Sequence, residues 1–268
     1  MRYVDFDGHV HTLPICFLRW HYRWTGVPVS VHNLRKAVDV VLKNGISFAL
    51  TDHDTLIPYR ALQSNEYKGK KIVEDGMIKD MGRVLKVKDK GFIIAGQEVS
   101  SREGHVLAWG IDEVIKAGMS AGDTVDAIQS AGGMAIIPHV HSRLGIGEKN
   151  LIKIIGKIDG IELSVGLGKP AWQKRVMELA GQYSLKVFSN NDAHIASCIG
   201  MKGLTKIPFS VFRKSSDKAI ISALRRLNPE DMEIVRNPKG RVVEMMMRLA
   251  DIARYVTSEM PFTLSRKI

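Results

Sequence analysis

The sequence predicts an α/β domain built on a mainly parallel sheet or barrel, and three observations lead to this prediction. Short runs of β-branched and apolar residues alternate with longer segments of helical periodicity, which is typical of strand–helix–strand units. The chain of 268 residues is long enough to bury a large core. Histidines and acidic residues lie at or just beyond the ends of several strand-like runs, where a parallel barrel gathers its functional side chains.

Short apolar or β-branched runs mark the expected strands. In chain order these are RYVDFD (2–7), ISFALT (46–51), FIIAGQEV (92–99), HVLAWGI (105–111), MAIIP (134–138), DGIELS (159–164) and KVFSN (186–190). The expected helices are 34–45, 123–133, 170–183, 217–227 and the methionine-rich 240–256. We expect Gly45 to end the first helix, Asp123 to be the N-cap of the second and Pro170 to lie in the first turn of the third. The section 66–90 is the least regular, and we expect an insertion or an exposed helix there.

Composition indicates one domain over residues 1–268, with the chemistry-bearing motifs between about 3 and 203 and a basic section, 204–268, that closes or extends the barrel. Two cysteines, Cys16 and Cys198, exclude a disulfide framework and a cysteine-based zinc site. We see no signal-peptide pattern and no apolar run of the roughly 18 residues that a membrane span needs. We therefore expect a cytoplasmic protein that does not contact a membrane.

The chain is basic, with 39 Lys and Arg against 28 Asp and Glu. Of the resulting net charge of +11, the residues from Met201 onward contribute +7, from 14 basic and 7 acidic side chains. Such charge attracts phosphate-rich ligands, including nucleic acid. A solvated, highly charged surface explains the same numbers without any ligand.

The stretch DGHVHT (7–12) places two histidines, His9 and His11, one residue apart after an apolar run. On an extended strand, residues i and i+2 point to the same side, so the pair could chelate a metal ion. Taken alone, such a pair is more often two packed or surface histidines than a chelate.

Other histidines and acids fall at the ends of later strand-like runs, which favours a metal site over packed or surface histidines. His53 follows the run 46–51, Glu98 lies near the end of 92–99, His105 begins 105–111, and the pairs His139/His141 and Asp192/His194 follow 134–138 and 186–190. Imidazoles and carboxylates together bind zinc, manganese or iron, and a bridging carboxylate can hold two ions about 3.5–4 Å apart. Glu98 is the best bridging candidate, and metal-bound hydroxide attacking a phosphorus atom is the chemistry that such a site favours.

In this order, the motifs DGHVHT, TDHDT, GQEVS, HVLAWGI, PHVH and NDAH resemble those of the PHP (polymerase and histidinol phosphatase) family of metal-dependent phosphoesterases. The resemblance covers about residues 3–203. It implies a distorted (βα)7 TIM-like barrel with two or three divalent ions, Zn, Mn or Fe, at the carboxyl ends of the strands. It implies a first metal held by His9, His11, Glu98 and Asp192, and a second held by Glu98, His105 and His139.

The resemblance also implies a third ion held by His53, His194 and an acid or histidine shortly after the first motif. Here the sequence departs from the family, because Cys16 and Phe17 stand at that point. Cys16 or His21 could substitute, Asp7 or Asp54 could contribute from another direction, or the third site could be weak. The residues expected to take a direct part in the reaction are Asp192, Glu98, His53 and His194, the last two by holding this ion or by assisting the leaving group.

Further residues are candidates for substrate binding or support. His141 could contact phosphate or orient His139, and Asp52 could accept a hydrogen bond from a ligand histidine. Arg143 suits a phosphate oxygen, although a surface salt bridge is an equal alternative. Arg19 and Arg23 alternate with aromatic residues in FLRWHYRW (17–24), a composition that can stack a base and hold its phosphate but could also form a loop packed on the barrel rim.

Together these features predict a metal-dependent phosphoesterase that acts on a small phosphomonoester, a nucleotide or the end of a short oligonucleotide. Histidinol phosphate is an alternative substrate. A second hypothesis is a non-catalytic PHP-like subunit that binds nucleic acid or a partner protein through its basic residues. A further alternative is metal-dependent amide hydrolysis on a related barrel. This sequence lacks the carboxylated-lysine position that such sites commonly use. The sequence does not indicate an oligomeric state.

Overall fold

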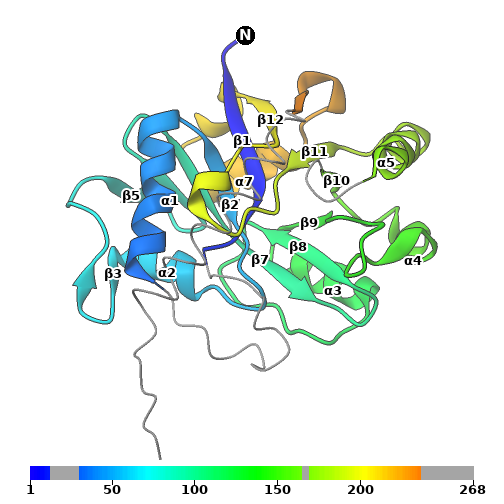
Figure 1. Cartoon of the computed structure of the whole chain (residues 1–268), viewed down its shortest axis with the longest axis horizontal. Coiled ribbons are helices and arrows are strands. Elements are labelled where there is room, and N and C mark those ends of the chain that lie inside the picture. Colours follow the sequence, from blue (N-terminus) through cyan, green and yellow to red (C-terminus); the bar gives the residue numbers. More distant parts are fainter. Residues whose placement is uncertain (13–29, 165–168, 237–268) are drawn as a thin grey trace, which may run out of the picture.

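The computed structural model describes residues 1–12, 30–164 and 169–236 (Figure 1). Its strands are β1 (Tyr3–Val10), β2 (Ser47–Leu50), β3 (Glu66–Tyr67), β4 (Lys70–Lys71), β5 (Ile78–Asp80), β6 (Val84–Val87), β7 (Gly91–Ser100), β8 (His105–Trp109), β9 (Met134–Ile137), β10 (Gly160–Ser164), β11 (Val187–Asn190), β12 (Gly203–Pro208) and β13 (Glu233–Arg236). Its helices are α1 (Val31–Asn44), α2 (Ile57–Ser64), α3 (Ala121–Ser130), α4 (Gly147–Ile154), α5 (Pro170–Tyr183), α6 (Phe209–Phe212) and α7 (Asp217–Arg225), with 3-10 turns at Ala196–Cys198 and Pro229–Asp231.

The strands form one large curved sheet in the order β11-β10-β9-β8-β7-β2-β1-β12-β13. Its two ends approach each other, because β11 contacts β1, β12 and β13, and Ala193 after β11 forms a parallel bridge with Val10 of β1. The result is a nearly closed barrel, with α1 and α2 on one side and α3, α4 and α5 on the other (Figure 1). The expected α/β barrel is confirmed.

The sheet is mixed, whereas the sequence predicts a mainly parallel one. Strands β1, β2 and β7 run parallel, as do β9, β10 and β11, but β8 is antiparallel to both β7 and β9, and β12 is antiparallel to β1. Only residues 101–104 separate β7 from β8. A connection this short allows an antiparallel hairpin, because a parallel crossover needs about a dozen residues or more.

Helix ends follow local chemistry. Gly45 adopts the left-handed conformation (φ 70°) after α1 and Pro170 begins α5, as predicted. The predicted N-cap Asp123 is wrong: the cap is Ser120, whose side chain accepts a hydrogen bond from the amide of Asp123. Asp123 lies instead in the first turn, where a negative charge is favourable to the helix dipole.

The section 66–90 forms the two hairpins β3–β4 and β5–β6, not a helix, and β6 extends the barrel sheet by pairing with β7. Sequence periodicity also missed the short helices α2, α4 and α6 and the strands β12 and β13, all of which are too short or too polar for a clear pattern. The methionine-rich segment 240–256 lies outside the described residues. Within the described ranges, none of the helices is long and apolar enough to cross a membrane.

Aromatic side chains fill the interior of the barrel. Phe6 of β1, Trp109 of β8 and Phe188 of β11 come from strands that are not neighbours in the sheet, yet the Trp109 ring lies 5.4 Å from Phe6 and 4.8 Å from Phe188 between ring centroids. The contact is so close that a Cβ on Gly8 would lie 2.1 Å from the Trp109 ring. This packing fixes β1 just before its two histidines.

Candidate metal centre

The two histidines of the first motif lie at the carboxyl end of β1 and reach the same carboxylates. His9 Nε2 lies 3.4 Å from Glu98 Oε2 and 3.5 Å from Asp192 Oδ1, and His11 Nε2 lies 3.3 Å from the same two atoms. The backbone after β1 is fixed by His11 N–H donating to the carbonyl of Ala193 at 2.7 Å. The i, i+2 spacing therefore directs both imidazoles to one side of the strand.

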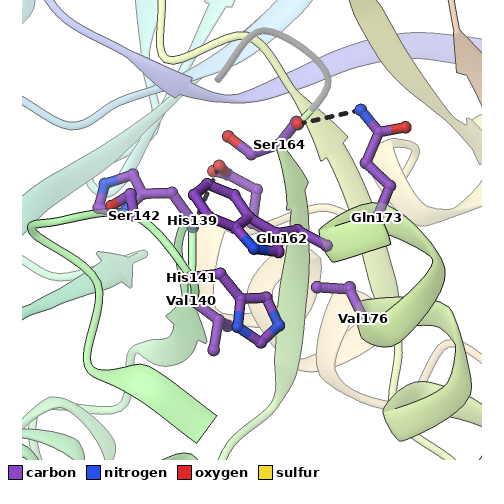
Figure 2. Close-up of a pocket in the computed structure, with 9 residues that line it drawn as sticks. His139, Val140, His141, Ser142, Glu162, Ser164, Gln173 and Val176 are labelled. Atoms are coloured by element: carbon purple, nitrogen blue, oxygen red, sulfur yellow. Dashed lines mark hydrogen bonds between the residues drawn. The ribbon is translucent and has the colours of Figure 1, made fainter. Parts of the chain in front are cut away.

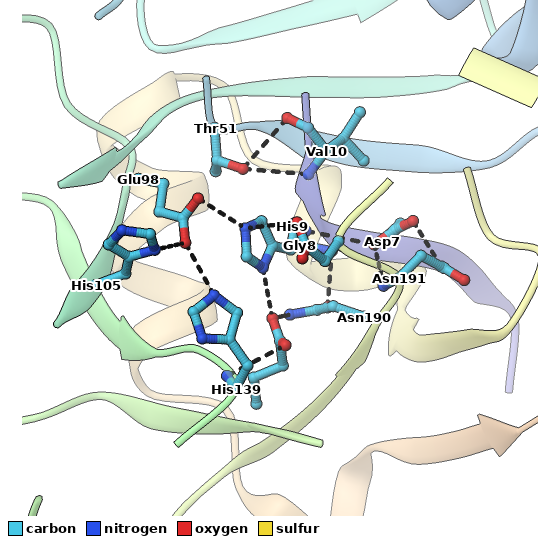
Figure 3. A network of polar contacts seen from close by, with 12 residues as sticks. Asp7, Gly8, His9, Val10, Thr51, Glu98, His105, His139, Asn190 and Asn191 are labelled. Carbon is cyan, nitrogen blue, oxygen red and sulfur yellow. Dashed lines mark hydrogen bonds and ion pairs between the residues drawn. The ribbon is translucent and has the colours of Figure 1, made fainter. Parts of the chain in front are cut away.

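Glu98, at the end of β7, lies at the centre of the cluster (Figure 3). Its Oε1 atom lies 2.6 Å from Nδ1 of His105 and 3.0 Å from Nε2 of His139. Its Oε2 atom faces the other imidazoles, namely His53 (Nδ1, 3.1 Å), His11 (Nε2, 3.3 Å) and His9 (Nε2, 3.4 Å). Each oxygen of this buried carboxylate thus has its own set of histidines, which is the arrangement that a bridging carboxylate requires.

Asp192 is the second buried carboxylate, in the turn after β11. Its Oδ1 atom lies 3.0 Å from Nε2 of His194, in addition to its approach to the two β1 histidines. Asp192 (φ 50°) and His139 (φ 28°) both have left-handed backbone conformations. Such conformations cost free energy in L residues and concentrate at functional sites, where the surrounding fold holds them in place.

The structure also identifies a residue that sequence reasoning missed, Glu162 of β10. Its Oε2 atom lies 2.8 Å from Nδ1 of His9 and accepts a hydrogen bond from Nδ2 of Asn190 at 3.2 Å. Asn190 in turn accepts from the amide of Gly8 through Oδ1 at 2.8 Å (Figure 3). A carboxylate on the far nitrogen of a ligand histidine fixes its ring orientation and raises its basicity. The available signal was a lone glutamate inside the apolar run DGIELS.

His139 has a corresponding partner, because its Nδ1 lies 3.0 Å from the hydroxyl of Ser142. Asp52 accepts from the amide and the hydroxyl of Thr12, both at 2.9 Å, and so holds the chain directly after His11. The predicted contact of Asp52 with a ligand histidine stays a prediction.

The charges in the cluster are strongly coupled. Burial opposes protonation of His11, but the carboxylates of Asp192 and Glu98 raise its pKa to about 9. Burial also disfavours the ionised form of Glu98, yet the imidazoles of His53 and His9 hold its pKa well below the usual value. Burial lowers the pKa of His53 well below that of a free imidazole, an effect that nearby histidines reinforce. The cluster therefore combines ionised carboxylates with imidazoles of which only some are protonated.

The residues fit a divalent metal ion. Among the described residues, Nε2 of His9, both ring nitrogens of His11 and Nδ1 of His105 are buried without a hydrogen bond of normal geometry. Groups of three candidate ligand atoms within 4.8 Å of one another are His9/His11/Asp192, His9/Glu98/His139 and His11/His53/Glu98. Imidazole and carboxylate donors of this kind suit zinc, manganese or iron. Metal ligation accounts for the buried nitrogens that hydrogen bonding leaves unsatisfied.

The region of the expected third ion is partly described. The rings of His53 and His194 stack on His11, with centroid separations of 4.7 and 4.3 Å. Asp7 and Asp54 do not point there: Asp7 accepts from Nδ2 of Asn191 at 2.6 Å and from the amide of Gly200, and Asp54 accepts from the amide and hydroxyl of Ser100. Both acids are occupied by structural hydrogen bonds. The other candidates, Cys16 and His21, lie outside the described residues.

The predicted substrate-binding residues have different outcomes. His141 lines a pocket beside the cluster, together with His139 and Glu162 (Figure 2). Arg143 is exposed and does not line that pocket. Arg19 and Arg23, with the aromatic residues around them, lie outside the described residues. The eight predicted metal-ligating residues lie in one cluster, in which His53 and His194 are half-buried and the other six are buried. Of the predicted substrate-binding residues within the described ranges, His141 lines the adjoining pocket and Arg143 does not.

Comparison with known proteins supports the fold. No family model matches the sequence. An uncharacterized protein of Methanocaldococcus jannaschii is 27% identical over 138 residues, which is 51% of this chain and 67% of that protein. Among solved structures, PsfC from Pseudomonas syringae PB-5123 superimposes with a TM-score of 0.67 at 15% identity, covering 93% of this chain and 99% of PsfC.

Two further structures have the same fold. A two-domain protein of Bacteroides vulgatus, described as containing a predicted PHP-like metal-dependent phosphoesterase, gives a TM-score of 0.53 at 12% identity, over 92% of this chain and 70% of that one. The lesion-specific Endonuclease Q of Pyrococcus furiosus gives 0.55 at 14% identity, over 88% of this chain and 60% of its own. Endonuclease Q is also solved with a duplex carrying an abasic lesion at its active site. This chain thus spans little more than half of that endonuclease.

Proposed function

Given that the chain has the fold of PHP-like metal-dependent phosphoesterases, we propose that it is itself a phosphoesterase and hydrolyses a phosphomonoester. The observation that carries the proposal is the buried Glu98 with separate histidines on its two oxygens. On the Oε1 side, His105 and His139 would hold one ion. On the Oε2 side, His9, His11 and Asp192 would hold the other. Divalent ions at such a site supply an acidified water and neutralise charge that develops on the phosphoryl group.

The protein groups around these ligands keep the site in order. Glu162 holds His9 through Nδ1, and Ser142 holds His139 through Nδ1. Because these bonds use the nitrogens that face away from Glu98, the opposite nitrogens keep their lone pairs for metal. Both supporting contacts are made by groups on the barrel and its adjoining turn, so the ligands are oriented before metal binds.

His53 and His194 take different roles in this proposal. His53 suits a third ion, because its Nδ1 lies 3.1 Å from Oε2 of Glu98 and its ring stacks on that of His11. His194 lies at the edge of the cluster, with Nε2 3.0 Å from Oδ1 of Asp192 and its ring stacked on that of His11. We assign it to the leaving group, to which it would deliver a proton through its ring nitrogen.

The basic charge of the chain supports a phosphorylated substrate. A net charge of +11 attracts phosphorylated ligands, and we propose a nucleotide or the end of a short oligonucleotide. We place this activity in the cytoplasm and in a single domain over residues 1–268. Histidinol phosphate is the alternative ester for the same site.

Metal analysis and turnover test the proposal. Protein purified without chelator is analysed for transition metals, and phosphate release is then measured from nucleotides and sugar phosphates with added Mn²⁺. We expect bound metal, turnover, and loss of both in Glu98→Gln, which replaces the shared charge with a neutral amide. The matched control is Glu113→Gln at an exposed position, which should behave as wild type. Absence of bound metal together with absence of turnover would overturn the proposal.

A further inference from the structure

A pocket lies directly beside the metal centre, between the turn after β9, the end of β10 and the first turns of α5 (Figure 2). It shares His139 and Glu162 with the cluster. Its opposite wall consists of Trp172 and Val176 of α5, and its remaining lining comes from Val140, His141, Ser142, Ser164 and Gln173. Because these two residues belong to both, the pocket adjoins the place where a phosphate on the metal centre would lie.

The walls of the pocket suit a flat ring. Trp172 is half-buried and offers an indole face, and Val140 and Val176 are buried apolar side chains beside it. The Trp172 and His141 rings are 6.1 Å apart between centroids and inclined by 32°. Stacking on an aromatic face is sequence-tolerant and strong for nucleobases.

Several polar side chains line the pocket, and one of them offers a buried atom to the edge of such a ring. Nε2 of His141 is buried and has no hydrogen-bond partner among the described residues. By contrast, the Ser142 hydroxyl is engaged with His139, and the Glu162 carboxylate with His9. A buried donor or acceptor without a partner is costly, so a ligand that bonds to His141 recovers free energy on binding.

The charge beside the pocket distinguishes among ring-bearing esters. The ammonium group of Lys169 lies 5.4 Å from the centroid of the Trp172 ring. A second cation on this aromatic wall would be repelled, which disfavours organic groups that carry an ammonium, such as an amino alcohol. A neutral heteroaromatic ring has no such penalty.

We propose that this pocket binds the nucleobase of a nucleotide substrate, with the ring stacked on Trp172 and its edge hydrogen-bonded to His141. This inference rests on the proposed phosphoesterase function, for which it names the determinant of substrate class. Trp172 is then a specificity residue, and the phosphate chemistry itself does not depend on it.

The test compares esters with and without a base. The probes are adenosine 5′-monophosphate, adenosine 3′-monophosphate and ribose 5-phosphate, each assayed with Mn²⁺-loaded protein. We expect wild type to prefer a nucleotide over ribose 5-phosphate in kcat/KM, and Trp172→Ala to reduce this preference about 5- to 100-fold. Turnover of ribose 5-phosphate should change less than about twofold. Trp172→Phe should keep most of the preference because it retains an aromatic face.

Tyr183→Ala is the matched control, since it truncates an exposed aromatic residue at the other end of α5. It should leave the preference unchanged. The inference is overturned if wild type shows no preference for either nucleotide, or if Trp172→Ala slows all three esters equally. The second result would mean that Trp172 only supports the fold.

Calorimetric binding of the same probes separates this inference from the proposed function. Binding that favours nucleotides in wild type but not in Trp172→Ala, without turnover of any ester, would support the pocket and overturn the phosphoesterase. Turnover without base preference would support the phosphoesterase and overturn the pocket. If the protein neither turns over nor binds any of the three esters, both the phosphoesterase and the pocket are overturned.

Discussion

Replacing Glu162 by glutamine tests whether this buried carboxylate organises the metal centre. Three donors converge on it: Nδ1 of His9 at 2.8 Å, Nδ2 of Asn190 at 3.2 Å and the amide of His139 at 3.4 Å. A glutamine side chain has one acceptor oxygen. If that oxygen faces His9 and Asn190, its amino group faces the amide of His139, and two donors then oppose each other.

The cost can be worked out from these contacts. A hydrogen bond to a charged group contributes about 1.5–3 kcal/mol and a neutral one about 0.5–1.5 kcal/mol, so loss of the charge on the His9 bond costs about 1 kcal/mol. The opposed donors add a contribution that is small at 3.4 Å. We expect the free energy of unfolding of the metal-free protein to fall by about 1–3 kcal/mol. Metal affinity should fall about 10- to 100-fold, as for other partners of ligand histidines.

Two measurements check this prediction. Urea unfolding of metal-free protein at pH 7 gives the free energy of unfolding, and competition with a chromophoric chelator gives the affinity for Zn²⁺ and Mn²⁺. Glu113→Gln, the same substitution at an exposed site, should stay within about 0.5 kcal/mol of wild type. If Glu162→Gln matched this control in both measurements, Glu162 would not orient His9.

Further predictions concern packing, proton linkage and metal. Gly8→Ala should lower the free energy of unfolding by about 1–3 kcal/mol, because the new Cβ would lie 2.1 Å from the Trp109 ring; Gly122→Ala in α3 meets no atom closer than 3.8 Å and should stabilise by about 0.4–1 kcal/mol in the same urea assay. Equal effects of the two substitutions would contradict the packing argument. Metal binding should release protons near pH 7, because burial opposes protonation of His11 but the neighbouring carboxylates raise its pKa to about 9. The apparent metal affinity should therefore rise with pH up to about 9. Calorimetry in buffers of different ionisation enthalpy that detected no proton release would refute this. Removing metal with a chelator should lower the thermal midpoint, since a ligand at a hundred times its Kd stabilises by about 2.7 kcal/mol, and an unchanged midpoint in metal-loaded and stripped protein would refute folded-state binding.

The sequence by itself determined much of the architecture and the membership of the central cluster. Apolar runs such as 46–51 and 134–138 are strands because their β-branched and aromatic side chains must be buried on both faces. Glycine and proline at Gly45 and Pro170 set helix ends through backbone constraints that are local in the chain. The histidines after β1, β2 and β9 were identified together because carboxyl ends of barrel strands converge.

Tertiary structure decided what depends on contacts between distant segments. The direction of β8 and the closure of β11 against β1 follow from sheet pairing, which period-2 patterns do not encode. Glu162 became a partner of His9 only when β10 came within reach of β1, since a single buried glutamate in a strand carries no sign of its partner. In the same way, Asp7 accepts hydrogen bonds from Asn191 and Gly200, and Trp172 lines a pocket beside His139. The fold, and not the spacing in the sequence, sets which of these side chains meet.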